Sequence, residues 1–438
     1  MKRKKFLTWI GQLLIKFQFF WLLTASFLTI LWLDNPSLAI SSPNGGEIRA
    51  VWLTTNDTNT VIDRAKLKES ITQLAKLNFN TIYPVVWNSG YALYESAVAQ
   101  KAGIQPFIPK GLQGQDPLED IISQAHQQGL QVMPWFEFGL MAPPTSELAL
   151  KHPNWFTKKR DGSNTVKSAA GEVIWLNPFH PEVQQFMTSL VVEVARKYEI
   201  DGIQFDDHLS FPYELGYDSY TVNLYKQETQ QAPPADPKDP TWMRWRATQL
   251  TAYVSQLNQT LKAIKPKAIF SISPNPYYVA YNFFLQDWLS WARQDLIDEV
   301  IVQIYRPDLP SFVKELTQPE IKEVQQKIPM GVGILTGLRN RPISMQLIEE
   351  KVLTARQYGL GVSFFFYDSL WNYAPETVPE RQSRFLALFS SPVNRPTRQI
   401  PIPTPALSEG VSVPTATQNP SQEPYYYDGI PIPVYPAW

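Results

Sequence analysis

The sequence contains no cysteine, only 4 histidines and almost no net charge. Without cysteine, a thiol nucleophile, a Cys-ligated zinc, an iron–sulfur cluster and disulfide bonds are all excluded. The 39 Lys and Arg residues balance 40 Asp and Glu residues to give a formal net charge of -1. This balance gives no electrostatic reason to expect nucleic acid or an anionic surface as the partner.

Metal and serine-hydrolase chemistry also lack support in the sequence. The four histidines include no two at helical ligand spacing, so we expect no metal and no other cofactor, although a carboxylate-bound Ca²⁺ stays open as an alternative. No G-x-S-x-G motif is present, which argues against a Ser-His-Asp hydrolase.

The N-terminus has the organisation of an export signal. MKRKK is basic, Phe17–Leu33 is a nearly uncharged apolar run, and Ser37-Leu38-Ala39 fits a small-x-small cleavage site. We interpret residues 1–39 as a signal peptide, with an uncleaved membrane anchor through residues 17–33 as the alternative. Either interpretation predicts an exported protein, periplasmic or extracellular, that meets the membrane only through this segment.

The central part of the chain alternates short apolar runs with amphipathic segments. The eight expected strands are Ile48–Leu53, Asn80–Val86, Leu130–Phe136, Gly202–Asp206, Ala268–Ser273, Glu299–Tyr305, Pro329–Leu335 and Gly361–Tyr367. The eight expected helices are Val61–Leu77, Pro117–Gln128, Pro181–Tyr198, Trp245–Ile264, Leu285–Gln294, Pro319–Lys327, Ser344–Tyr358 and Pro379–Phe389. This pattern predicts an α/β fold, a (β/α)8 TIM barrel over residues 47–390. A doubly wound open sheet is the alternative, disfavoured because no Gly-rich loop follows the first strand.

Two long connections and a tail complete this organisation. Phe138–Phe179 and Leu209–Thr241 follow the third and fourth strands, at the end of a barrel where enzymes build their sites. Residues 391–438 are rich in Pro, Ser and Thr, and we expect a flexible tail without a further domain.

The stretch IDGIQFDDHLSFP, residues 200–212, is the strongest functional signal. Because strand side chains alternate, Gln204 and Asp206 share one face, while Ile203 and Phe205 share the other. In a barrel Asp206 then points inward at the rim. Asp207 lies one step on, so we expect the two carboxylates to diverge, with Asp207 bracing a loop or a neighbouring cation.

The same parity places polar residues from other strands at one rim. Glu137 ends the third strand beside Trp135, Phe136 and Phe138, and apolar neighbours raise the pKa of a carboxyl group. Cleavage of a glycosidic bond needs one ionised carboxylate and one protonated acid. We assign Asp206 to the ionised role and Glu137 to the acid, with Asp207 and Asp368 as reserves. A structural Glu137 that pairs with an arginine is the alternative.

A groove of aromatic and polar side chains is expected around these carboxylates. They would stack on sugar rings and hydrogen-bond their hydroxyl groups. The expected substrate-binding residues are Trp87, Asn88, Tyr94, His208, Asn275, Tyr305, Arg306, Asp368 and Trp371. A loop-structural role for His208 is equally open.

Long stretches of the chain resemble the family 10 glycosyl-hydrolase-like proteins, a family of exported bacterial TIM barrels. They include IRAVWLTTNDT, LNFNTIYPVVWNSGYALYES, AHQQGLQVMPWFEFGLM, HPNWF, WLNPFHPEV, DGIQFDDHLSFP, SISPNP, LQDWLSWARQDLIDEVIVQIYRPD and GVSFFFYDSLW, within residues 47–371. The resemblance implies a glycosidase fold and a cell-wall glycan as substrate. DGIQFD is also similar to the amylase-type strand that ends in the nucleophilic Asp, which implies that role for Asp206. Amylase-type enzymes carry their acid Glu after the fifth strand, where this chain reads SPNP.

The sequence therefore predicts an exported glycoside hydrolase that cleaves a polysaccharide by a two-carboxylate mechanism, with peptidoglycan glycan strands as the expected substrate. A non-catalytic glycan-binding cell-wall protein on the same barrel is the main alternative. A polysaccharide lyase or deacetylase-like enzyme is a third, and the scarcity of histidine speaks against its metal-dependent form.

Overall fold

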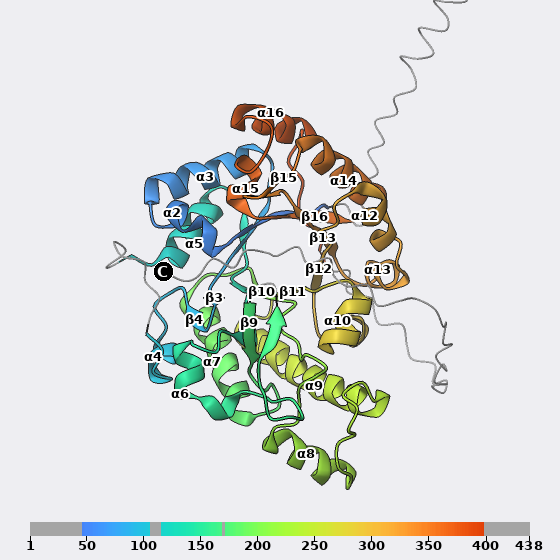
Figure 1. Cartoon of the computed structure of the whole chain (residues 1–438). Helices are drawn as coiled ribbons and strands as arrows, with labels where there is room; N and C mark the ends of the chain where they lie inside the picture. Colours follow the sequence, from blue (N-terminus) through green and yellow to red (C-terminus); the bar gives the residue numbers. More distant parts are fainter. Residues whose placement is uncertain (1–45, 106–114, 169–170, 398–438) are drawn as a thin grey trace, which may run out of the picture. The chain divides into compact units, whose positions relative to one another are not determined.

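Eight parallel strands lie at the centre of this computed structural model (Figure 1). The structure describes residues 46–105, 115–168 and 171–397. The barrel strands are β1 (Arg49–Leu53), β2 (Thr81–Pro84), β5 with β6 (Gln131–Val132 and Trp135–Phe136), β10 (Gly202–Asp206), β11 (Ile269–Ser273), β12 (Glu299–Gln303), β13 (Met330–Leu335) and β16 (Gly361–Phe365). All eight strands expected from the sequence are confirmed.

The third barrel strand closes the ring although Pro134 interrupts it. Its first half, β5, pairs with β2, and its second half, β6, pairs with β10. Val85, just beyond β2, forms a parallel bridge with Trp135 in β6. Proline supplies no N–H to a ladder, so the strand breaks there, yet the carbonyl of Pro134 still accepts a 2.9 Å hydrogen bond from the Gln204 N–H.

A helix follows each barrel strand and packs on the outside of the sheet (Figure 1). These helices are α3 (Arg64–Lys76), α5 (Pro117–Gln127), α7 (Pro181–Lys197), α9 (Pro240–Ile264), α11 (Trp288–Arg293), α13 (Pro319–Val324), α14 (Met345–Gln357) and α16 (Val378–Leu388). The expected start of α9 at Trp245 was wrong. The Asp239 side chain accepts from the N–H groups of Thr241 and Trp242 and starts the helix at Pro240.

Short elements missed by the sequence pattern fill the loops between each strand and its outer helix. They are η1 (Thr55–Asp57), α2 (Thr58–Val61), β3 (Trp87–Asn88), β4 (Tyr91–Ala92), α4 (Ala97–Lys101), β7 (Met141–Ala142), α6 (Glu147–Lys151), η2 (Pro153–Trp155), β8 (Val166–Ser168), β9 (Gly171–Trp175), α8 (Ser219–Thr229), α10 (Tyr277–Phe284), α12 (Leu309–Leu316), β14 (Gly337–Leu338), β15 (Arg341–Pro342) and α15 (Tyr367–Trp371). All follow the carboxyl ends of barrel strands, so this face carries most of the irregular structure.

The interior of the barrel holds a chain of polar groups as well as aromatic rings. The Trp52 indole donates to Gln204 Oε1 at 2.7 Å, and Gln204 Nε2 donates to Ser271 Oγ at 2.9 Å. Ser271 and Tyr83 then both donate to Oε1 of Glu299, at 2.8 and 2.7 Å. Every member is buried and hydrogen-bonded, as a buried polar group requires.

The segment after α16 packs beneath the barrel, at the amino ends of the strands. The Glu47 N–H donates to Asn394 O at 3.0 Å, and Asn80 Nδ2 donates to Val393 O at 3.2 Å. The Arg395 guanidinium donates to Glu299 Oε2 and to Thr81 Oγ1. The prediction of a flexible tail from residue 391 was therefore wrong for residues 391–397, because a buried carboxylate recruits Arg395. The remainder of the tail lies outside the described residues.

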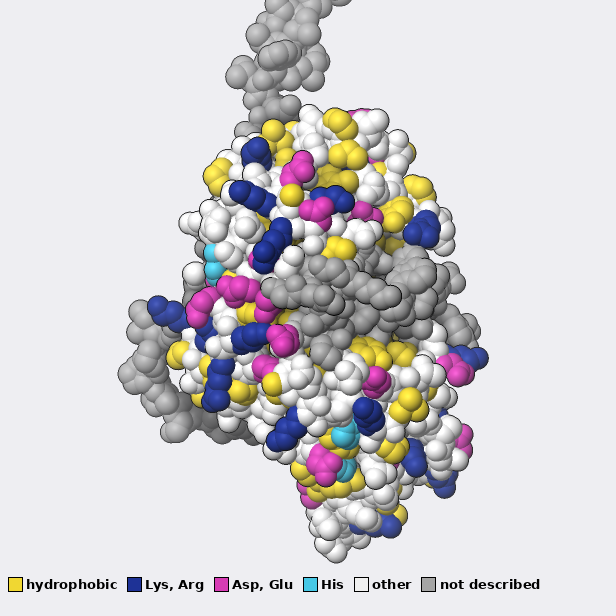
Figure 2. All heavy atoms as spheres, turned by 90° about the vertical axis from the view of Figure 1, so that its left-hand side faces the viewer, with side chains coloured by type: hydrophobic (Ala, Val, Ile, Leu, Met, Phe, Trp, Pro, Cys, Tyr) yellow, Lys and Arg dark blue, Asp and Glu magenta, His cyan; other side chains and the backbone are white. Residues whose placement is uncertain are grey.

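The surface and the helices agree with the composition. Acidic and basic side chains are intermixed over the face shown in Figure 2, as the small net charge leads one to expect. Among the described residues, no helix combines the length and the apolar character needed to cross a bilayer. The apolar run 17–33 lies outside the described residues, so the signal or anchor stays a prediction.

Replacement of Arg395 tests the packing of this segment. Arg395→Ala leaves the Glu299 carboxylate buried without its cation, and we expect a loss of about 3 kcal/mol in the free energy of unfolding, measured with urea. The control is Arg293→Ala, which breaks a half-exposed ion pair with Glu323 and should cost less than about 1 kcal/mol. In a Glu299→Gln background the Arg395 substitution should cost much less. Equal costs in both backgrounds would contradict the pairing.

Candidate functional site

The register between β6 and β10 brings Glu137 and Asp206 to the same edge of the barrel. Gln204 lies opposite Trp135, and Phe205 lies opposite Phe136. The next position on β10 is Asp206, its last residue, and the next position after β6 is Glu137. The two carboxylates therefore leave neighbouring strands at their carboxyl ends.

Asp206 is buried and held by two donors on one oxygen. The Asp207 N–H donates to Asp206 Oδ1 at 2.7 Å, and the Gln303 amide, at the end of β12, donates to the same oxygen. Burial raises the pKa of Asp206 well above its usual range, and the neighbouring Asp207 carboxylate raises it further, with a smaller contribution from Glu137. The inward direction expected for Gln204 and Asp206 agrees with their buried contacts.

Asp207 lies beside Asp206 rather than turning away from it. Gln303 Nε2 lies 3.5 Å from Asp207 Oδ1 while it donates to Asp206, and Asn275 Nδ2 donates to Asp207 Oδ2 at 2.7 Å. The expected divergence of the two carboxylates was wrong. Strand alternation ends at the last residue of β10, so the turn is free to bring Asp207 back toward the lumen.

Glu137 has the environment of a carboxyl group that keeps its proton. Asn88 Nδ2 donates to Glu137 Oε2 at 2.5 Å, and the side chain stays partly exposed. Burial, opposed by the Asn88 hydrogen bond and assisted by the charge of Asp207, raises the pKa of Glu137 to about 7. No ion pair joins Glu137 to an arginine among the described residues, which disfavours the structural alternative.

His208 joins the loops that carry Glu137 and Asp206. Its Nδ1 donates to the Glu137 carbonyl at 2.8 Å, and the Leu140 N–H donates to the His208 carbonyl at 3.0 Å. Gly139 has a φ of +43°, and a Cβ there would come within 2.8 Å of the His208 backbone. Only glycine lets the two loops approach this closely.

Asp206, Asp207 and His208 offer three ligand atoms within 4.8 Å of one another. Such a set could hold a divalent cation. However, the amides of Gln303 and Asn275 already direct N–H groups at the two carboxylates, and these donors compete with a cation for the oxygen lone pairs. We therefore interpret this group as hydrogen-bonded carboxylates.

Three residues expected to bind substrate lie in the core. Trp87 is fully buried, with its indole donating to Gly139 O at 3.0 Å, and Tyr94 is buried, donating to Glu193 Oε2 at 3.1 Å. Trp371 is 8% exposed and packs edge-on against Phe385 of α16. Their contacts anchor the loops over the barrel, and their assignment to the groove stays a prediction, since Asp206 and Asn275 are as buried as Trp371.

The remaining predicted residues differ in their relation to the carboxylates. Asn88, His208 and Asn275 contact the acidic group directly, as described above. Tyr305 packs against the ring of Phe365 with a centroid distance of 5.5 Å. Arg306 forms an ion pair of 2.7 Å with Glu315 on α12.

Asp368 follows β16, which β1 and β2 separate from the strand that leads to Glu137. Its N–H donates to the buried carboxylate of Asp57 at 2.8 Å, and its own Oδ1 accepts from Asn372 at 2.7 Å. These contacts tie the β1 and β16 loops together. They give Asp368 a structural role, and the structure brings it no contact with Glu137, Asp206 or Asp207 among the described residues.

Sequence reasoning missed Gln303 as a site residue, although it contacts both aspartates. Its position on the inward face of β12, with Ile301 and Tyr305, was the available signal. Gln303 Nε2 also donates to Ser273 O at 2.8 Å, so the amide is fixed by two strands. It organises the acidic pair without bringing a charge.

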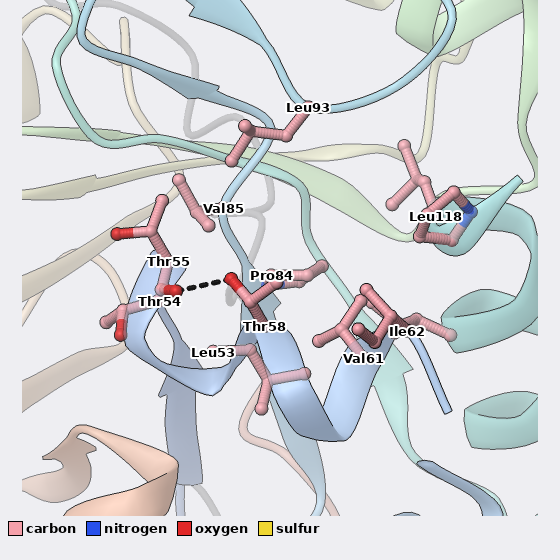
Figure 3. Close-up of a pocket in the computed structure, with 12 residues that line it drawn as sticks. Leu53, Thr54, Thr55, Thr58, Val61, Ile62, Pro84, Val85, Leu93 and Leu118 are labelled. Carbon is pink, nitrogen blue, oxygen red and sulfur yellow. Dashed lines mark hydrogen bonds between the residues drawn. The ribbon is translucent and has the colours of Figure 1, made fainter. Parts of the chain in front are cut away.

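A separate apolar pocket lies beside the ends of β1 and β2 (Figure 3). It is lined by Leu53, Thr54, Thr55, Thr58, Val61, Ile62, Pro84, Val85, Leu93, Pro117, Leu118 and Ile121. At this pocket the Thr58 hydroxyl donates to Thr55 O at 2.5 Å, the dashed line in Figure 3. The lining contains no titratable group, so the pocket has no acid–base chemistry of its own.

A (β/α)8 barrel with carboxylates at the carboxyl ends of neighbouring strands is an arrangement that glycosidases use. The model of the family described as glycosyl hydrolase-like 10 matches residues 47–354. The chain belongs to this family. The resemblance found in the sequence is thus confirmed.

The curated relatives are glycosyl hydrolases by name. The chain is 26% identical over 270 residues to glycosyl hydrolase DigH of Escherichia coli (strain K12), covering 56% of this chain and 59% of that one. It is 25% identical over 297 residues to glycosyl hydrolase YngK of Bacillus subtilis (strain 168), covering 59% and 54%. The match therefore spans little more than half the length of these relatives.

Solved structures share the fold at low identity. The PgaB (BpsB) glycoside hydrolase domain from Bordetella bronchiseptica has a TM-score of 0.59 at 12% identity, covering 78% of this chain and 98% of that domain. The catalytic domain of β-amylase from Paenibacillus polymyxa has a TM-score of 0.53 at 11% identity, covering 80% and 99%. Both are glycosidase barrels, and they support the TIM-barrel fold.

Gly139→Ala tests the contact between the Glu137 and Asp206 loops. The added Cβ meets the His208 backbone in a left-handed conformation, and we expect a loss of at least about 2 kcal/mol in the free energy of unfolding. The matched control is Gly162→Ala, where φ is +87° but nothing lies within 4 Å of the Cβ. That variant should lose only about 1 kcal/mol from backbone strain. Similar losses, measured by urea unfolding, would argue against a close approach of the two loops.

Proposed function

We propose that this chain is an exported glycoside hydrolase that cleaves glycosidic bonds of a polysaccharide, with peptidoglycan glycan strands as its substrate. The family and the glycosidase folds of its structural neighbours supply the general class. Hydrolytic activity, export and the peptidoglycan substrate are our inferences. They rest on the site residues and on the N-terminal sequence.

One observation carries the catalytic proposal. Glu137 and Asp206 leave adjacent strands at the same edge, and each has a neutral amide as its side-chain donor, Asn88 and Gln303 respectively. A neutral partner orients a carboxyl group without the strong pKa depression that a cation would cause. The pair therefore retains a proton for general acid catalysis near neutral pH.

The two carboxyl groups divide the chemistry. Glu137 donates its proton to the leaving glycosidic oxygen, and its pKa of about 7 keeps that proton available. Asp206 acts at the oxocarbenium-like centre in its ionised form, and because burial raises its pKa this role is confined to the higher-pH part of the activity range. Its Oδ1 accepts from Gln303 and from the Asp207 N–H, so we assign Oδ2 to the attack or to the stabilisation of positive charge. The neighbouring Asp207 carboxylate raises the pKa of Asp206 further.

A non-catalytic glycan-binding protein is the second candidate, and one feature favours it. The segment after β11 carries Asn275 where amylase-type enzymes carry their acid, and this amide donates to Asp207. A barrel that has lost its acid could still bind a glycan. Product release distinguishes the two candidates.

Asp206→Asn is the direct test of catalysis. Wild-type protein incubated with purified sacculi, or with other glucans, should release fragments detectable by mass spectrometry. Asp206→Asn should remove nearly all release while glycan binding persists, and Glu137→Gln should lower kcat by about 10²–10⁴-fold. Asp295→Asn, at a side chain 58% exposed and with φ of +59°, is the matched control and should leave turnover unchanged. Normal turnover by Asp206→Asn would refute the assignment, and no release by the wild type would favour the binding protein.

The pH dependence tests the role of Glu137. General acid catalysis requires the protonated form of Glu137, so kcat/KM of the protein should fall as the pH rises through about 7. The Asn88 hydrogen bond lowers the pKa of Glu137, so Asn88→Ala should move this alkaline limb to higher pH while reducing kcat through lost orientation. A limb that stays in place in Asn88→Ala would assign the acid to another group.

Export is testable with the N-terminal segment alone. We propose that residues 1–39 direct the barrel out of the cytoplasm, and a fusion of these residues to a reporter active only outside the cytoplasm should be active. N-terminal sequencing of the exported product distinguishes cleavage near Ala39 from an uncleaved anchor. An inactive reporter made in normal amounts would contradict export.

A further inference from the structure

An aromatic surface that the carboxylate mechanism does not use lies on α10 and the neighbouring β10 loop. It consists of Tyr213, Tyr278 and Phe283, named here the α10 ledge. Phe283 contacts both tyrosines edge-on, with ring centroids 6.1 Å from Tyr213 and 6.4 Å from Tyr278. Tyr278 is 60% exposed, among the most exposed large hydrophobic side chains of the described residues. An aromatic ring with this much exposed surface is not stabilised by burial in the protein, and it is available for contact with a ligand.

The α10 ledge is held rigidly from behind. The Tyr213 N–H donates to Phe283 O at 2.9 Å, and the Phe211 N–H donates to Phe284 O at 2.7 Å. The buried guanidinium of Arg246 on α9 donates to the Tyr213 carbonyl at 2.5 Å. Rings fixed in this way lose little conformational entropy when they bind a ligand.

One ring of the α10 ledge has an open face. Lys238 Nζ lies 4.7 Å from the ring centroid of Tyr213 and 5.5 Å from that of Phe283, so it covers part of these two rings. No comparable cation lies over Tyr278 among the described residues. Tyr278 is therefore the residue of the ledge that can offer its ring to a ligand.

The α10 ledge lies close to the acidic site along the chain. Asn275, which donates to Asp207, is three residues before Tyr278, and consecutive Cα atoms are about 3.8 Å apart. Tyr278 thus lies at most about 11 Å along the chain from a residue that contacts the carboxylates. This separation is short enough for one polysaccharide chain to contact both places.

We propose that the α10 ledge is a distal glycan subsite, in which Tyr278 stacks on a sugar ring away from the bond that is cleaved. The chemistry favours a sugar because a pyranose ring presents apolar C–H groups to the aromatic face and hydroxyl groups to water. This inference rests on the proposed function, because it takes the chain bound at the carboxylates as the ligand. In this proposal Tyr278 makes the protein bind long glycan chains more tightly than short ones.

Binding in an inactive background tests the subsite separately from catalysis. The full chain carrying Asp206→Asn is titrated with soluble peptidoglycan glycan strands and with the corresponding disaccharide. Adding Tyr278→Ala should weaken binding of the strands about five- to tenfold and leave disaccharide binding unchanged. Tyr278→Phe should keep strand binding, since the ring is retained. Leu353→Ala, at a 50% exposed position on α14, is the control and should change neither.

The outcomes separate this inference from the proposed function. Strand binding that drops with Tyr278→Ala supports the subsite even if the wild type releases no product, a result that would refute hydrolysis alone. Unchanged strand binding by Tyr278→Ala overturns the subsite and leaves hydrolysis intact. Equal weakening of strand and disaccharide would also overturn it, by placing Tyr278 at the cleavage point. Failure of the Asp206→Asn parent to bind the strands would overturn the subsite, and product release by the wild type then decides the proposed function separately.

Discussion

The parallel register of β6 against β10 is the constraint on which the candidate site depends. With Phe205 opposite Phe136, the next residues along each strand are Asp206 and Glu137. A shift of one residue in either strand would turn one carboxylate toward the outer helices. The stacked rings of Phe205 and Phe136, 4.8 Å apart on the outer face, and the Gln204 N–H bond to Pro134 O hold this register. Apolar packing on the outer face of the sheet thereby sets which carboxylates lie next to each other at the rim.

Neutral partners give this acidic site its electrostatic character. Glu137, Asp206 and Asp207 each receive a side-chain amide, from Asn88, Gln303 and Asn275 respectively. Arginine in these places would fix the acids as permanent anions. The amides orient the carboxyl oxygens, while burial and the repulsion between neighbouring carboxylates set how many protons the site holds. The site therefore holds protons near neutral pH. Deeper in the lumen a carboxylate does have a cationic partner, because Glu299 is paired with Arg395. Glu299 is not one of the carboxylates at the rim.

The strands and their inward faces could be predicted because barrel strands are short, apolar and separated by helices of regular period. The carboxylates at strand ends followed from alternation alone, and so did the direction of Asp206. Alternation does not continue past the end of a strand, which is why the position of Asp207 was wrong. Aromatic residues in the loops were ambiguous for a different reason. Trp87, Tyr94 and Trp371 have the composition of a sugar-binding wall, yet their hydrogen bonds and ring contacts place them in the core.

Contacts between distant parts of the chain could not be read from local patterns. The Pro-rich composition after residue 390 indicates a chain without periodic structure, and nothing in it marks Arg395 as the partner of Glu299. Likewise, Gln303 acquires its role only because β12 and β10 bring it to Asp206 across the lumen. Both cases depend on closure of the ring, which joins residues about a hundred positions apart.

The chain's passage beneath the barrel has a consequence for how the protein is made. Asn394 accepts from Glu47, the Ser391 carbonyl accepts from Arg49, and β1 pairs with β16, so the first and last described segments complete one another. A nascent chain still lacking these residues has an unsealed lumen with an unneutralised Glu299. The native state therefore needs the segment that carries Arg395, and such long-range closure slows folding. A factor that binds unfolded chains can therefore act on this one before the ring closes.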